Sequence, residues 1–133
     1  MNDVQSLAIS EANGYFRDFT RQAYAAWDCF NVHLFEGALS VPFIKVDKFN
    51  CAWGGCHMPG YFPGVKSTIL IEAEFITRCG MRSRFFLARL ILLHEMVHQY
   101  LYECKGQRCG RDGAHSYAFA CLCNALSAKA GLL

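Results

Sequence analysis

The sequence has little proline, little charge and no long apolar run. Only 3 of the 133 residues are proline and 18% are charged, against about 25% charged residues in an average soluble domain. With 53% apolar or aromatic residues, this composition excludes a disordered chain. We expect one domain over residues 1–133, with its core at about 15–130, because a chain of this length buries only one ordinary core.

The absence of a long apolar run bears on location. The richest run, Leu90–Leu93, ends at His94 and is far shorter than the ~20 residues of a membrane-spanning helix. The first residues contain neither a basic region nor a sustained apolar stretch, which argues against a secretory signal. We therefore expect no membrane span and a cytoplasmic protein, or a nuclear or nucleoid-associated one if it works on DNA, and we do not expect secretion.

The eight cysteines contain no Cys-x-x-Cys pair. Such a pair is required for a zinc ribbon or a thioredoxin-type motif, so both are excluded. The cysteine content, 8 of 133 residues or about 6%, is below the ~8–10% of disulfide scaffolds. We expect reduced thiols, most of them serving as small buried apolar side chains.

Positive charge is concentrated in the second part of the chain. Residues 1–77 hold five Lys or Arg and eight Asp or Glu, whereas residues 78–133 hold eight and three, a net 8 − 3 = +5. Seven of these eight basic residues lie between Arg78 and Arg111. The cluster is either a solvated face or a surface for an acidic partner.

The N-terminal part predicts helices. Apolar residues at three- and four-residue steps predict an amphipathic helix over Tyr15–Asn31, and its expected core face is Phe16, Phe19, Ala23, Ala26, Trp27 and Phe30. A shorter helix is expected to begin at Asp3 as its N-cap and to end before Asn13-Gly14.

The rest of the chain predicts a small sheet followed by two helices. Short apolar runs separated by turn residues, among them Gly54-Gly55, predict three strands, at Phe43–Val46, Cys51–Trp53 and Thr68–Ile71. Residues 82–104 lack Gly and Pro and are apolar on nearly every side, which predicts a central buried helix. A glycine-containing loop then leads to a last helix over His115–Ala130. The predicted fold class is α+β.

The strongest motif is the His-Glu-x-x-His pentad formed by His94, Glu95 and His98 within the central helix. Residues four apart on a helix project from one face, so the two imidazoles could share one metal ion, with Glu95 within reach of a water on that ion. The pentad predicts a catalytic zinc site.

A catalytic zinc usually has three protein ligands, and His115 is our choice for the third, with Asp112 as a candidate to orient a ligand. Cys104 and Cys109 are weaker alternatives. Cys104 stands where a metzincin has its third His, and no downstream acid is placed like the Glu of a thermolysin-type site. His33 and His57 lack the partners that a second metal site needs.

This ligand set predicts amide hydrolysis. Zinc lowers the pKa of its bound water towards ~7 and polarises a carbonyl, and Glu95 would act as the general base. The candidates for stabilising the oxyanion are Tyr100, Tyr102 and Tyr117, each of which could equally be a core or rim aromatic residue.

Two stretches resemble the SprT-like metalloprotease domain, the family that includes the Spartan proteases. They are Leu92–His98, which contains the pentad, and Arg111–Phe119, in which His115 and Phe119 match the family's Gly-His-Gly-x-x-Phe element. The segment Phe30–Pro42 and the strand Thr68–Ile71 are also similar, so the resemblance covers about residues 16–126. Two departures are Ala114 and Ser116 in place of the flanking glycines. We expect no zinc ribbon of the kind that follows this domain in many members.

The resemblance implies a zincin-like fold and a zinc-dependent endopeptidase that acts on DNA-associated or DNA-crosslinked proteins with DNA as activator. We expect the protein to be a monomer. Single-stranded or junction DNA would contact basic residues of the second part, namely Arg78, Arg82, Arg84, Arg89, Lys105, Arg108 and Arg111. Trp53, Tyr61 or Phe62 could stack on unpaired bases. The alternative is a non-catalytic, zinc-stabilised module that binds DNA or protein.

Overall fold

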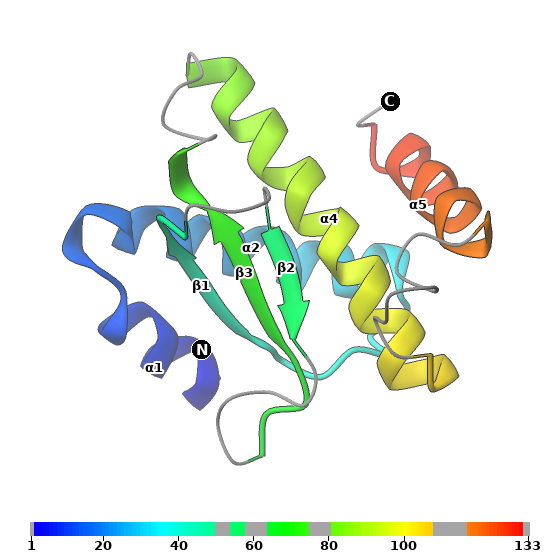
Figure 1. Cartoon of the computed structure of the whole chain (residues 1–133), viewed down its shortest axis with the longest axis horizontal. Helices are drawn as coiled ribbons and strands as arrows, with labels where there is room; N and C mark the ends of the chain where they lie inside the picture. Colours follow the sequence, from blue (N-terminus) through cyan, green and yellow to red (C-terminus); the bar gives the residue numbers. More distant parts are fainter. Residues whose placement is uncertain (1, 50–53, 58–63, 75–80, 108–116, 132–133) are drawn as a thin grey trace.

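The computed structural model describes residues 2–49, 54–57, 64–74, 81–107 and 117–131, with side chains except at 54–57, 81–87 and 118. The helical elements are α1 (Asp3–Glu11), the 3-10 turn η1 (Gly14–Phe16), α2 (Arg17–Leu34), α4 (Met81–Lys105) and α5 (Tyr117–Lys129). The strands are β1 (Phe43–Asp47), β2 (Gly54–His57) and β3 (Thr68–Glu72). Figure 1 shows one sheet with α4 across one face and α5 beside α4, and the α+β prediction is confirmed.

The sheet is mixed, with strand order β1-β3-β2. Strands β1 and β3 are parallel, with Phe43 opposite Thr68, and β2 runs antiparallel to β3, with Gly54 opposite Ile71. Gly54-Gly55 is thus part of a strand, and its prediction as a turn was wrong, because both glycines pair with β3. The predicted strand Cys51–Trp53 lies outside the described residues.

Strand β3 is largely buried on both faces, which explains its apolar run, whereas the parallel strand β1 exposes Lys45. Ile44, Ile69 and Ile71 are each at most 1% exposed. Helices α1 and α2 contact β1, while α4 contacts β2 and β3. The sheet therefore supports α4, the helix that carries the pentad.

The buried face of α2 differs from the predicted one. Thr20, Tyr24, Trp27 and Asn31 are buried, whereas the predicted members on α2 other than Trp27 are only partly buried. The polar residues are buried because they bond to backbone: the Tyr24 hydroxyl donates to the Pro42 carbonyl and accepts from the Ile44 N–H, both at 2.8 Å. Apolar periodicity could not identify positions whose burial depends on hydrogen bonds.

Two further expectations are corrected. Asn2, one residue before Asp3, caps α1 by accepting from the Val4 N–H at 2.7 Å. Of the cysteines whose side chains are described, Cys123 is half-buried, and three are exposed because they lie on the outer sides of helices, namely Cys29, Cys104 and Cys121. These four are free thiols, as expected. Within the described ranges, every helix is too short or too polar to cross a bilayer.

Candidate metal centre

The pentad lies in the most deeply buried part of α4. Leu92, Leu93, Met96 and Val97 are at most 1% exposed, so packing fixes the rotation of the helix about its axis. The 3.6-residue period then places His94 and His98 on a common face. Their ring centroids are 5.2 Å apart, at an interplanar angle of 76°.

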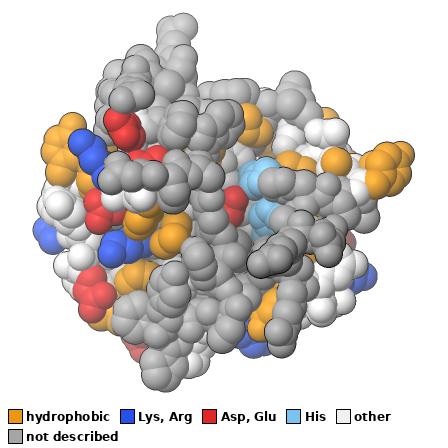
Figure 2. Space-filling model, in the orientation of Figure 1, with side chains coloured by type: hydrophobic (Ala, Val, Ile, Leu, Met, Phe, Trp, Pro, Cys, Tyr) orange, Lys and Arg blue, Asp and Glu red, His pale blue; other side chains and the backbone are white. Residues whose placement is uncertain are grey.

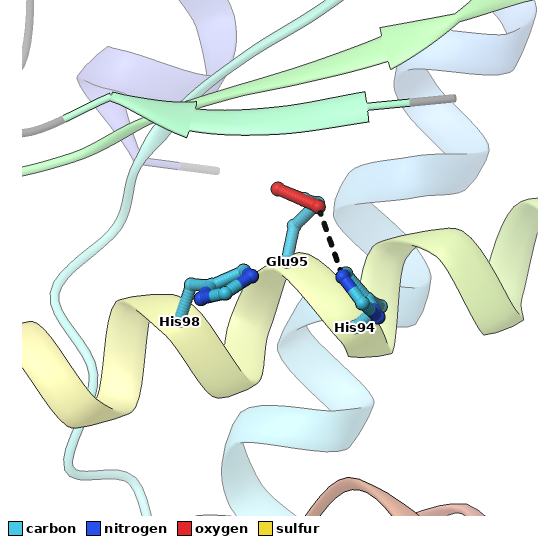
Figure 3. Close-up of side chains that lie close together, drawn as sticks. All are labelled: His94, Glu95 and His98. Atoms are coloured by element: carbon cyan, nitrogen blue, oxygen red, sulfur yellow. Dashed lines mark ion pairs between the residues drawn. The ribbon is translucent and has the colours of Figure 1, made fainter. Parts of the chain in front are cut away.

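Glu95 completes a cluster with the two imidazoles (Figure 3). One potential ligand atom from each of the three side chains lies within 4.8 Å of the others. Figure 2 shows histidine side chains reaching the molecular surface, and the His94 side chain is 37% exposed. Among the residues that the structure describes, this is the one group of three or more such side chains close enough to share a metal ion.

The Glu95 carboxylate is buried and incompletely partnered. The residue is 4% exposed, and Oε1 lies 3.8 Å from His94 Nε2. Within the described part of the chain, Oε2 has no hydrogen-bond partner. A buried carboxylate oxygen without a partner is costly, and a cation or a water held by a cation would supply one. The donor set therefore fits a metal ion, and two imidazoles with a carboxylate are typical of zinc and other transition metals.

Burial also changes the acidity of Glu95. Desolvation raises the pKa of its carboxyl from 4.5 to about 8, because the charged form loses its hydration. A carboxyl group with a pKa near neutrality can both accept and return a proton. A bound cation would favour the carboxylate form and act against this shift.

The stability of the metal-free protein should therefore depend on pH through Glu95. With a chelator present, the folded state binds the Glu95 proton more tightly than the unfolded state does. The protonated carboxyl therefore contributes its full stabilisation below pH 4.5, and this contribution is lost as the pH rises through about 8. In the wild type, we expect the free energy of unfolding to fall by roughly 1 kcal/mol or more between those limits. Glu95→Gln cannot ionise at this position and should not show this fall. Urea unfolding of both chains at several pH values, with EDTA, measures the difference. Parallel pH profiles would contradict the assignment.

Helix α5 covers the imidazoles with an aromatic ring. Phe119, 4% exposed, stacks on the His98 ring at a centroid distance of 4.2 Å and an interplanar angle of 22°. Its ring also meets the His94 ring edge-on, at 4.9 Å and 72°. The sequence indicated Phe119 only through the family resemblance.

A buried polar network lies next to the pentad, and the sequence analysis missed it. Gln99, fully buried, accepts from Trp27 Nε1 at 3.1 Å and donates through Nε2 to the Ser40 carbonyl and to Glu103. Glu103 also accepts from the Ser40 N–H and the Ser67 hydroxyl. The signal for it was the spacing of Gln99 and Glu103, two polar residues four apart and therefore neighbours on one face of the helix.

Several predicted site residues belong to the part of the chain that is not described. His115, Asp112, Cys109, Arg78, Arg108, Arg111, Trp53, Tyr61 and Phe62 lie outside the described residues, as do the side chains of His57, Arg82 and Arg84. Of the other basic residues, Arg89 and Lys105 are exposed. The basic cluster is thus still a prediction.

The side chains of other candidate site residues are described. Cys104 is exposed near the end of α4, with Sγ 4.0 Å from the Ala38 carbonyl oxygen, and is not in the cluster. His33 is exposed. Tyr100 packs on Phe35, with ring centroids 5.5 Å apart, and Tyr117 is 87% exposed.

Compared with protein-family models, with curated proteins and with solved structures, the chain gives no match.

Proposed function

We propose that this protein is a zinc-dependent endopeptidase of the SprT-like type, with a zincin-like fold. The observation that carries the proposal is the cluster of His94, Glu95 and His98 on one face of a buried helix, with a carboxylate oxygen left without a partner among the described residues. An ordinary core position would not hold a carboxylate in this state.

Three histidines are the proposed ligands of the zinc ion. His94 and His98 would hold it through imidazole nitrogens, and His115 is the proposed third ligand, on the strength of the sequence alone. When bound, Zn²⁺ supplies Lewis-acid polarisation of the substrate carbonyl and lowers the pKa of water. The two-histidine set spaced by one helical turn is typical of this chemistry.

Glu95 would move the proton. Its buried carboxylate takes a proton from water as the water oxygen attacks the carbonyl carbon of the scissile peptide, and the same proton passes to the leaving nitrogen as the C–N bond breaks. The carboxylate extends from α4 towards the sheet, on the side of β2 (Figure 3). Burial suits this role because the proton must be accepted and returned near neutral pH.

The sheet offers a way to bind an extended peptide. Strand β2 is at the end of the sheet, and no described strand pairs with its outer edge. It also contacts α4. Backbone groups on an open edge can pair with a peptide in an extended conformation, which would present a peptide bond to the side of α4 that holds Glu95.

The natural substrates we propose are DNA-associated or DNA-crosslinked proteins, on the basis of the resemblance and of the basic residues between 78 and 111. The second candidate is a non-catalytic zinc module that binds DNA or protein. It is favoured by the position of the Glu95 carboxylate among the potential ligand atoms, because a carboxylate that ligates the ion directly cannot serve as a free base.

The proposal is tested on the purified full chain. We expect one bound Zn²⁺ per chain by elemental analysis, and cleavage of a DNA-binding protein that increases when single-stranded DNA is added. His98→Ala should lose most of the zinc and the cleavage, whereas the exposed His33→Ala should retain both. A wild-type chain without zinc would refute the metal site. Full zinc without cleavage of any protein, with or without DNA, would favour the non-catalytic module.

A further inference from the structure

Phe119 lies against both histidines of the metal centre, from a different helix. Its centroid distances are 4.2 Å to His98 and 4.9 Å to His94, and its ring is almost completely buried. A single side chain of α5 therefore contacts both imidazoles of α4.

A helix by itself does not orient an imidazole. The backbone of α4 fixes where each Cβ lies, but rotation of a histidine ring about its last side-chain bond is broad and weakly restricted. Two rings that must direct nitrogen atoms at one point need further constraints. In metal proteins such constraints usually come from groups around the ligands, and removing them weakens metal binding about 10- to 100-fold.

The geometry of Phe119 supplies such a constraint. A parallel ring stacked on His98 resists tilting of that imidazole, while the edge-on contact limits rotation of His94. Aromatic pairs at these separations attract in both arrangements. The two imidazoles lie at a mutual angle of 76°, and the same phenyl ring contacts both of them.

We propose that Phe119 is a positioning residue, which holds the His94 and His98 imidazoles in the orientation that a metal ion requires and thereby couples the docking of α5 to metal affinity. This inference rests on the proposed metal binding by the two histidines. It does not depend on the reaction that follows.

The test compares Phe119→Leu with Leu126→Ala. The first change keeps an apolar side chain and removes the ring. The second weakens the packing of α5 against the core about two turns away, without removing the ring. Phe119→Tyr is the conservative variant, since it keeps both ring faces. Zn²⁺ affinity is measured by competition with a chromophoric chelator, and the coordination geometry by the visible spectrum of the Co²⁺-loaded chain.

We expect Phe119→Leu to bind Zn²⁺ about 10-fold or more weakly than wild type and to alter the Co²⁺ spectrum, with Phe119→Tyr and Leu126→Ala close to wild type. Equal affinity in Phe119→Leu and wild type would overturn the inference and leave the proposed function intact. A loss of affinity in Leu126→Ala as large as in Phe119→Leu would show a merely structural role. A wild-type chain that binds no metal would instead refute the proposed function.

The ring contact also predicts shifted proton resonances in the wild-type chain, and this test requires no variant. In the chelator-treated wild type, the His98 ring protons should resonate upfield of ordinary histidine positions, because they lie over the face of Phe119. His33, an exposed histidine, gives the internal reference. His98 ring protons at the same positions as those of His33 would overturn the inference.

Discussion

Glu95→Gln is expected to lower the rate of peptide cleavage by about 10²- to 10⁴-fold, the usual contribution of a positioned general base. The change keeps the shape of the side chain and removes its ability to accept a proton. Because the Glu95 carboxylate is buried and its pKa is raised to about 8, the neutral amide should be at least as well tolerated by the fold. The measurement is cleavage of a protein substrate at saturating zinc.

The zinc content of the Glu95→Gln variant distinguishes a general base from a metal ligand. If Glu95 is a base and no ligand, the variant should keep one zinc per chain and lose only turnover. Loss of both zinc and activity would instead identify the carboxylate as a ligand and favour the non-catalytic module, and undiminished activity would refute the role of Glu95. Glu11→Gln, an exposed change on α1, is the matched control and should behave as wild type.

Gln99→Leu is expected to lower the free energy of unfolding by roughly 2–4 kcal/mol. The substitution nearly conserves volume, but it removes the partners of two groups, the indole N–H of Trp27 and the carbonyl of Ser40. Each polar group left buried without a partner costs about 1–3 kcal/mol. Urea unfolding measures the loss.

A double-mutant cycle separates the network from simple packing. Trp27→Phe removes the orphaned indole N–H, so the double variant with Gln99→Leu should be more stable than the sum of the two single losses predicts. Strict additivity would show that the bond between Trp27 and Gln99 contributes nothing. Because Gln99 follows His98 directly in α4, zinc affinity should fall with stability in the single variant.

Much of the fold follows from local pattern. Strands β1 and β3 were predicted to within one residue, and α4, found at Met81–Lys105, was expected over 82–104. Continuous apolar runs identify buried strands, and a long segment free of Gly and Pro identifies a helix, because these signals lie within a few neighbouring residues. The strand β2 at Gly54–His57 was not predictable in this way, since its two glycines indicate a turn until pairing with β3 is known.

The sequence by itself determined that His94, Glu95 and His98 share one face of a helix, since the helical period alone requires it. Tertiary structure decided the state of that site: the burial of Glu95, the Phe119 ring against the imidazoles, and the hydrogen bond that joins Gln99 to Trp27, 72 residues away. Periodicity reports only which face of an element is apolar, whereas desolvation and ring contacts arise when distant elements pack together. The chemistry of the motif is therefore local, and the environment that adjusts it belongs to the fold.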